Sequence, residues 1–378
     1  MGTKARYVGV LVALLALAAL HPSVALARSP QSGAVYLMTN QDQNAVAVFE
    51  RAPNGTLRPA GTFPTGGSGD PIAEAGDPPF DPLASQGALV LSDDERFVFA
   101  VNAGSNEVSV LAIRRRGLTL VDKVRSGGIR PISLTVHEDL LYVLNEGGTP
   151  NITGFVLSDR GRLTALAGST RPLTVGSAAD PAQVAFSPDG ELLAVTDKAS
   201  NVIDTYTVGE DGLARGPRPN ASAGPTPFGF AFNRRGHLVV TEIGGALSSY
   251  ATAEDGALST VSESVPDFQT AACWVVITRN GRYAFVSNPG SSSVSSYRVG
   301  SDGTLTLLEP VAGSVVGRSG EPGHGLDMAL DRSGRYLYVH AAGVQAIAAF
   351  RVGRDDGSLT PVGITGGLPF AAQGIAAR

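Results

Sequence analysis

Histidine is the side chain best suited to move protons near neutral pH, and the sequence contains only five. His324 stands out because it lies just before a short apolar segment and is followed three residues later by Asp327. A histidine and a carboxylate at this spacing could act as a general base and its partner. The alternative is a loop histidine with only local hydrogen bonds. The pair makes His324 and Asp327 the catalytic candidates.

Other polar or aromatic side chains begin further short apolar segments and could line a binding site. They are Gln86, Ser133, Gln183 and Trp274. Trp274 is the only tryptophan, and it could serve as an apolar platform for a ligand or simply pack between elements. Gly-x-Ser-x-Gly, His-Glu-x-x-His and Walker motifs are absent from the sequence. The sequence predicts no cofactor and no metal site, since Cys273 is the only cysteine.

A repeated pattern of strands must position these residues. A β-rich strand is followed by an Asx-Gly or similar turn, a second apolar strand that ends in a polar residue, and two further strands. The polar end markers are spaced 43, 52, 45, 46 and 52 residues apart and are Asn102, Asn145, Asp197, Glu242, Asn288 and His340. Four-stranded repeats at this spacing predict an all-β propeller. The column Ala88, Ser133, Gln183, Gly229, Trp274 and Asp327 is then expected near the channel entrance.

One repeat is split between the two ends of the chain. Val35 to Asn40 reads as a second strand with no first strand before it, and the missing strand matches Gly374 to Ala377. The sequence therefore predicts seven blades of four antiparallel strands each, with the first blade closed by the C-terminal strand. This closure removes two exposed sheet edges.

The stretch from Gly66 to Ala84 interrupts the repeats and is rich in Gly, Pro and Asp. We expect a solvated loop over one face of the propeller. The alternative is a loop whose carboxylates hold a Ca²⁺ ion or shape a binding site, although the spacing matches no EF-hand pattern. The four carboxylates are Asp70, Glu74, Asp77 and Asp81.

The first 27 residues have the three-part layout of a secretory signal peptide, with cleavage predicted after Ala27. The apolar run Val8 to Leu20 is 13 residues long, which is short for a membrane span of about 20 residues. Residues 28–378 then form a single secreted propeller domain. Removal of Lys4 and Arg6 changes the formal charge from −5 to −7, so nucleic acid is excluded as a partner. We expect a monomer that does not span a membrane.

The repeats resemble those of the seven-bladed β-propeller lactonases. The resemblance is carried by Pro181 to Gly190, by Val101 to Val110 and by the Asp-Gly-x-Leu turns, and it covers Gly33 to Ala377. That family includes 6-phosphogluconolactonase and the carboxymuconate lactonizing enzyme; Val101 to Val110 is also similar to repeats of surface-layer propellers. The lactonases typically place His and Arg at the starts of their inner strands. Here the matching residues are Ala182-Gln183 and Phe228-Gly229.

The resemblance implies an extracellular enzyme that opens or closes a lactone ring, that is, a carboxylic ester hydrolase or a lactone-forming cycloisomerase. The site would lie in the channel mouth and hold a small molecule. The rival hypothesis is a non-catalytic propeller scaffold that binds a cell-envelope ligand or protein through its loop face.

Overall fold

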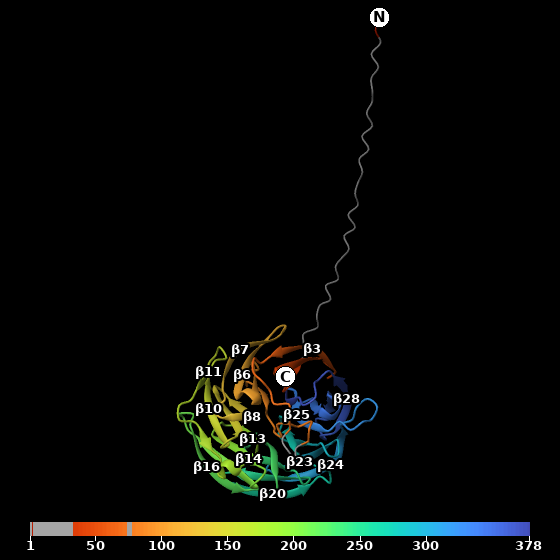
Figure 1. The fold of residues 1–378 in the computed structure, drawn as a ribbon. Coiled ribbons are helices and arrows are strands. Elements are labelled where there is room, and N and C mark those ends of the chain that lie inside the picture. The colour runs from red at the N-terminus through yellow and green to blue at the C-terminus, as the bar shows by residue number, and fades with distance from the viewer. Residues whose placement is uncertain (1, 3–32, 74–77) are drawn as a thin grey trace. The chain divides into compact units, whose positions relative to one another are not determined.

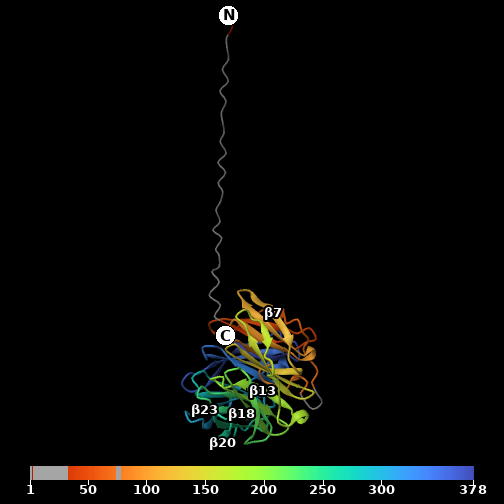
Figure 2. The same ribbon diagram turned by 90° about the vertical axis from the view of Figure 1, so that its left-hand side faces the viewer.

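The computed structural model describes Gly2 and residues 33–73 and 78–378. The predicted signal peptide, Glu74 and Asp77 lie outside the described residues. The described chain from residue 33 onward forms seven antiparallel sheets around one centre. Figure 1 shows this ring of sheets face-on, and Figure 2 shows it turned by 90°. Among the described residues, no helix is long and apolar enough to cross a membrane.

Each sheet is one blade, and blades are numbered here in chain order with strands given from the inside outward. Blade 1 contains β29 (Gln373–Ala377), β1 (Ala34–Met38), β2 (Ala45–Arg51) and β3 (Leu57–Pro64). Blade 2 contains β4 (Leu89–Leu91), β5 (Phe97–Asn102), β6 (Glu107–Arg114) and β7 (Gly117–Arg125). Blade 3 contains β8 (Ile129–His137), β9 (Leu140–Gly147), β10 (Asn151–Leu157) and β11 (Leu163–Ala165), with β12 (Arg171–Pro172) also on β10.

The remaining blades repeat the same order without interruption. Blade 4 contains β13 (Pro181–Phe186), β14 (Leu192–Asp197), β15 (Val202–Val208) and β16 (Ala214–Ala221). Blade 5 contains β17 (Pro227–Phe232), β18 (Leu238–Glu242), β19 (Ala246–Thr252) and β20 (Leu258–Pro266). Blade 6 contains β21 (Trp274–Ile277), β22 (Tyr283–Asn288), β23 (Ser293–Val299) and β24 (Leu305–Ser314). Blade 7 contains β25 (Gly325–Leu330), β26 (Tyr336–Ala341), β27 (Ala346–Val352) and β28 (Leu359–Gly366). Three 3₁₀ turns complete the fold: η1 (Ala103–Ser105), η2 (Gly176–Ala178) and η3 (Ala342–Val344).

The closure of blade 1 by the C-terminal strand is confirmed. β29 pairs antiparallel with β1, with Ile375 opposite Leu37 and Ala376 opposite Tyr36. Ile375 is buried, so the strand contributes apolar surface as well as ladder hydrogen bonds. β1 and the C-terminal strand β29 therefore share one sheet, and β29 covers the edge of β1 that would otherwise be unpaired.

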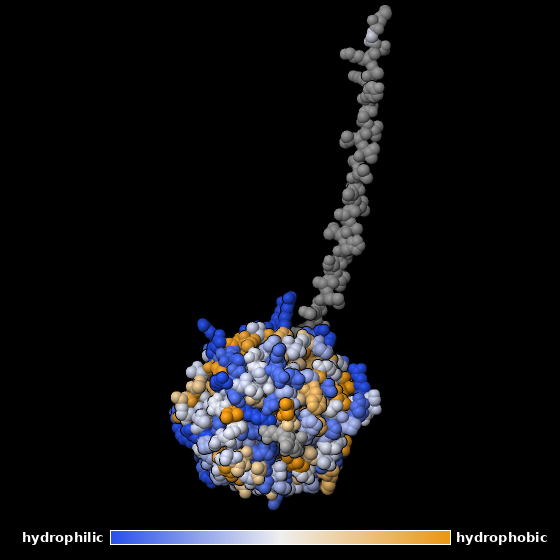
Figure 3. All heavy atoms as spheres, in the orientation of Figure 1, coloured by the Kyte–Doolittle hydropathy of each residue, from blue (hydrophilic) through white to orange (hydrophobic). Residues whose placement is uncertain are grey.

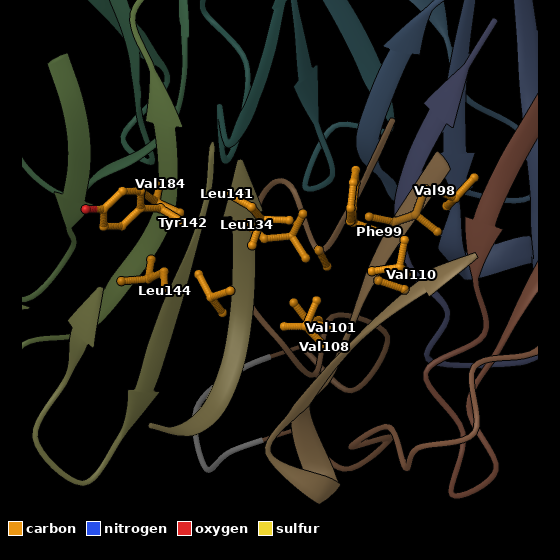
Figure 4. Close-up of a cluster of buried hydrophobic side chains, with 14 of the residues drawn as sticks. Val98, Phe99, Val101, Val108, Val110, Leu134, Leu141, Tyr142, Leu144 and Val184 are labelled. Carbon is orange, nitrogen blue, oxygen red and sulfur yellow. The ribbon is translucent and has the colours of Figure 1, made fainter. Parts of the chain in front are cut away.

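The core lies between neighbouring blades, where apolar residues of adjacent sheets pack face to face. Figure 4 shows part of it, with Phe99, Leu141 and Val184 from three successive blades in one cluster. Buried tyrosines add hydrogen bonds across these interfaces. The Tyr142 hydroxyl donates to the Gly212 carbonyl and accepts from the Ala214 amide, both at 2.8 Å. A buried phenol thus keeps its polar tip satisfied while its ring fills the core.

A hydrogen bond from a serine hydroxyl to the aspartate two residues later shapes turns between the first and second strands of a blade. In blade 4 the Ser187 hydroxyl donates to Asp189 at 2.5 Å, and Gly190 takes a φ of +78° that glycine adopts without strain. The Ser187 hydrogen bond and the backbone N–H of Glu191 lower the pKa of Asp189. The same serine–aspartate contact recurs between Ser92 and Asp94 in blade 2. These turns fix where each second strand starts and so set the blade register.

Candidate active site

The centre of the ring is crossed by the chain itself. The connection between blades 1 and 2 ends in residues 81–87, which run between the inner strands. The Trp274 indole N–H of blade 6 donates to the Ser85 carbonyl at 2.9 Å. Ser85 Oγ donates to the Ile132 carbonyl of blade 3 at 2.9 Å, and the Gln86 amide donates to the Ala182 carbonyl of blade 4 at 3.1 Å. These bonds reach blades on opposite sides of the ring, so the segment fills the middle of the channel.

Only the end of the connection differs from the solvated loop that the composition predicts for Gly66 to Ala84: residues 81–84 are buried, whereas Gly66, Ile72 and Pro78 are exposed. Leu83 is fully buried in the core cluster of blades 1 to 4, which draws the end of the connection inward. Asp70 pairs with Arg130, with 3.0 Å between Oδ2 and Nε. The described residues contain no group of three or more His, Cys, Asp or Glu that could hold a metal ion.

The side-chain amides of the predicted lining residues Gln86 and Gln183 each form two hydrogen bonds with the backbone of a residue in another blade, as a neighbouring strand would. Gln183 donates from Nε2 to the Phe230 carbonyl at 3.0 Å and accepts from the Phe230 amide at 2.7 Å. Gln86 makes the same pair of bonds with Val275, at 2.9 Å and 3.2 Å. Both side chains are buried. Gln183 joins β13 to β17, and Gln86 joins the crossing segment to β21.

Ser133 also links neighbouring inner segments of the propeller. Its hydroxyl donates to the Gln86 carbonyl at 2.7 Å and accepts from the Val184 amide at 3.2 Å, and the residue is fully buried. The structure therefore places Gln86, Ser133 and Gln183 among the bonds that hold the inner strands together.

The two predicted catalytic residues lie at the start of β25: His324 directly precedes the strand, and Asp327 is its third residue. The His324 ring stacks on Phe80, with 4.7 Å between centroids and 16° between planes. Its Nδ1 lies 2.9 Å from the Pro289 carbonyl. Because a carbonyl only accepts, Nδ1 carries the proton and Nε2 is left with a basic lone pair. His324 thus lies at the mouth with a nitrogen able to take a proton.

Asp327 lies deeper, below the mouth. Its carboxylate accepts from the Met328 amide at 2.8 Å and from the Gly87 amide at 3.3 Å. Burial raises the pKa of Asp327 to about 7 in spite of these backbone donors. In the described structure no hydrogen bond joins it to the His324 side chain.

A cavity of about 360 Å³ opens at the mouth beside the crossing segment, between the inner ends of blades 4, 5 and 6. Trp274 lines it, so this predicted residue does reach a cavity. Its lining consists of Pro78, Phe80, Asp81, Ala84, Asp180, Lys198, Ala199, Thr226, Phe228, Ile243, Ala271, Cys273, Trp274, Pro289 and Leu326. His324 borders the cavity through Phe80 and Pro289.

Lys198 is the one cation in this lining, and it was not singled out from the sequence. It follows β14 directly after the marker Asp197, and its side chain is only 8% exposed. Its Nζ lies 2.9 Å from Asp180 Oδ1, donates to the Ala84 carbonyl at 3.2 Å, and sits 5.5 Å above the centre of the Phe228 ring. An ammonium held in this way can stabilise negative charge that develops on a bound oxygen.

The apolar wall of the cavity is rigid. Phe228 and Trp274 meet edge to face, with 5.0 Å between centroids and 68° between planes. The bond from Trp274 to Ser85 fixes the orientation of the indole. Cys273, beside them, is buried, and burial raises the pKa of its thiol, so it is not a ready nucleophile. The site is therefore an aromatic pocket with one cation and two carboxylates.

A shared backbone feature presents the mouth residues. Six non-glycine residues around the mouth take a left-handed conformation, with φ between +41° and +65°: Ala84, Arg130, Thr226, Ala271, His324 and Ala371. Thr226 is the most strained of the six, because a β-branched side chain is crowded against the backbone in the left-handed conformation. The residues at the mouth thus lie about three positions before the aligned column that begins with Ala88 and Ser133, which the repeats predict to be near the channel entrance. Pro131, Pro181 and Pro227, which follow mouth residues, were the available signal in the sequence.

Comparison with known proteins agrees with this architecture. A family model described as "Lactonase, 7-bladed beta-propeller" matches residues 25–175 and 177–369. None of the curated proteins with which the sequence was compared matches it.

Among solved structures, a putative 6-phosphogluconolactonase from Bacteroides fragilis is 19% identical, with a TM-score of 0.68 over 93% of this chain and 98% of that one. A periplasmic gluconolactonase from Pseudomonas aeruginosa is 15% identical, with a TM-score of 0.68 over 90% and 98%. A protein from Lactobacillus plantarum is 18% identical, with a TM-score of 0.70 over 92% and 99%. At these identities the likeness is one of fold.

Proposed function

Because this chain belongs to the lactonase family of seven-bladed β-propellers, we propose that it hydrolyses a lactone in the cavity beside Lys198. The observation that carries the proposal is the buried ammonium of Lys198, held by Asp180 in the wall of an aromatic pocket. Ester hydrolysis needs a group that stabilises the oxyanion and a base that activates water. The pocket lining contains both kinds of group.

In the proposed reaction the lactone carbonyl oxygen points toward Lys198 Nζ. A water oxygen attacks the carbonyl carbon while one of the lining carboxylates, Asp81 or Asp180, takes a proton from that water. The bond between the carbonyl carbon and the ring oxygen then breaks, and the same carboxylate returns the proton to the ring oxygen. The product is an open-chain hydroxy acid, and the reverse sequence of steps closes the ring.

His324 is the second candidate for the base, since its ring stacks on Phe80 and its Nδ1 contacts the Pro289 carbonyl, and both of these residues line the cavity. Asp327 would then serve only below the mouth, as a buried acid that holds the strand starts of blades 2 and 7 together. The two assignments make different predictions for single variants. Loss of a general base typically lowers the rate by about 10² to 10⁴.

The test is hydrolysis of γ- and δ-valerolactone followed by pH-stat titration of the acid released. We expect Asp81→Asn or Asp180→Asn to lower kcat by at least about 10², with His324→Ala closer to the parent protein. A large loss in His324→Ala alone assigns the base to His324. Folded protein that turns over no lactone contradicts the proposal and leaves the non-catalytic scaffold as the explanation.

We further propose that the protein is exported and cleaved after Ala27. The support is the layout of the first 27 residues, with Lys4 and Arg6 before an apolar run and small residues at the cut. N-terminal sequencing of protein recovered outside the cell should then begin at Arg28. Protein that stays in the cell with Met1 in place would contradict the export proposal.

A further inference from the structure

We infer that the cavity selects an uncharged lactone with an apolar substituent, an inference that rests on the proposed lactonase function and narrows its substrate class. The lining is mostly apolar. Its apolar members are Pro78, Phe80, Ala84, Ala199, Phe228, Ile243, Ala271, Trp274, Pro289 and Leu326. Figure 3 shows hydrophobic residues interspersed among polar ones near the middle of the face turned to the viewer.

The charge of the lining argues against an anionic substrate. Its ionised side chains are Asp81, Asp180 and Lys198, which sum formally to −1. The positive charge of Lys198 is already paired with Asp180 at 2.9 Å. With two N–H groups of Lys198 on Asp180 and Ala84 and the third assigned to the lactone carbonyl, a phosphate or carboxylate elsewhere on the substrate would meet a lining of net negative charge with no second cation to bind it.

The shortage of donors and acceptors argues against a polyhydroxylated ring. Each hydroxyl that is buried without a partner costs free energy, so a sugar lactone needs a lining with many polar groups. Here the charged or hydroxyl-bearing side chains of the lining are Asp81, Asp180, Lys198 and Thr226. Asp180 and Lys198 bind each other, and the Trp274 indole N–H is already bonded to Ser85. Phe80 and Phe228 offer only ring faces and edges. An alkyl or aryl substituent against this wall gains apolar burial without leaving a polar group unpaired.

The test is a series of γ-lactones that differ only in the length of the alkyl chain, from γ-butyrolactone through γ-hexalactone to γ-octalactone. Each methylene buried against the aromatic wall should raise kcat/KM about fourfold until the cavity is full. Glucono-δ-lactone and its 6-phosphate should be turned over more slowly than γ-hexalactone. A flat series, or a preference for the phosphorylated lactone, would overturn the inference.

Binding of an inert analogue separates this inference from the proposed reaction. The 5-alkyl-2-pyrrolidinones keep the ring and the chain but resist hydrolysis, and the single tryptophan, Trp274, reports their binding by fluorescence. If the lactams bind more tightly with longer chains while no lactone is hydrolysed, the proposed function fails and the selectivity stands. If lactones are hydrolysed but neither the rates nor the lactam affinities depend on chain length, the selectivity fails and the function stands.

A change of charge at the mouth provides an independent check. Thr226 lines the cavity at φ +55°, and Arg130 takes the same left-handed conformation in blade 3, so the backbone accepts arginine there. Thr226→Arg should raise kcat/KM for γ-carboxy-γ-butyrolactone relative to γ-hexalactone by about tenfold or more, with Thr226→Gln as the uncharged control. An unchanged ratio in Thr226→Arg would show that pocket charge does not set the preference.

Discussion

Replacement of His340 by asparagine should make the propeller more resistant to acid. His340 is fully buried near the end of β26, and its Nδ1 has no hydrogen-bond partner among the described residues. Burial lowers the pKa of His340 from 6.5 to about 3. Blades 2, 3 and 6 carry asparagine at the matching place, so the side chain suits the fold.

The magnitude follows from proton linkage. Below pH 6.5 the unfolded chain binds a proton at His340 that the folded chain does not bind, so folding stability falls as the pH drops toward 3. One pKa unit is worth about 1.4 kcal/mol, which gives about 3 kcal/mol between pH 6.5 and pH 4. The variant lacks this loss, whereas any packing cost of the substitution is the same at both pH values and cancels in the comparison.

The assay is urea unfolding followed by Trp274 fluorescence, at pH 7.5 and pH 4, for the parent protein and His340→Asn. The difference in unfolding free energy between the two proteins should move by about 3 kcal/mol in favour of the variant on going to pH 4. A difference that stays constant within about 0.5 kcal/mol would show instead that His340 is protonated in the folded state or is reached by water.

Three further predictions concern stability. Deletion of Gln373–Arg378 should cost at least about 5 kcal/mol, since it removes buried Ile375 and the ladder to β1; an unchanged melting temperature would contradict the closure of blade 1. The unfolding free energy of Asp327→Asn should rise relative to that of the parent protein by about 2 kcal/mol between pH 5 and pH 7 in urea titrations, because burial raises the Asp327 pKa from 3.8 to about 7 and the folded state resists losing that proton; a pH-independent difference would show an ionised carboxylate. Gln183→Met should cost about 2 to 4 kcal/mol in chemical denaturation, as it strands the Phe230 amide and carbonyl, and a cost under about 0.5 kcal/mol would show that water replaces the glutamine.

The fold could be predicted from the sequence because each blade of a propeller repeats the same sequence pattern. The polar end markers recur in six blades, and the split seventh copy identifies the C-terminal strand as the partner of β1. The family resemblance rests on the same repeats and is confirmed by the matching family model.

The site was less accessible because it depends on how side chains turn between blades. Gln183 begins an inner strand, yet its amide pairs with Phe230 of the next blade, and no local pattern reveals this direction. Lys198 follows the end marker Asp197 and becomes part of the pocket only because Asp180 and Phe228 of neighbouring segments surround it. In the connection between blades 1 and 2, Leu83 is fully buried whereas Ile72 is 76% exposed, so apolar residue type alone does not show that residues 81–87 enter the ring.

We propose that Lys198 stabilises the oxyanion of a lactone in the mouth cavity. The most direct test compares γ-hexalactone hydrolysis by Lys198→Met with that by Lys123→Met, whose lysine pairs with Glu107 in blade 2 away from the cavity lining. We expect Lys198→Met to lower kcat by about 10² to 10³ while the protein stays folded, and Lys123→Met to retain the parent rate. Equal rates in the two variants would contradict it.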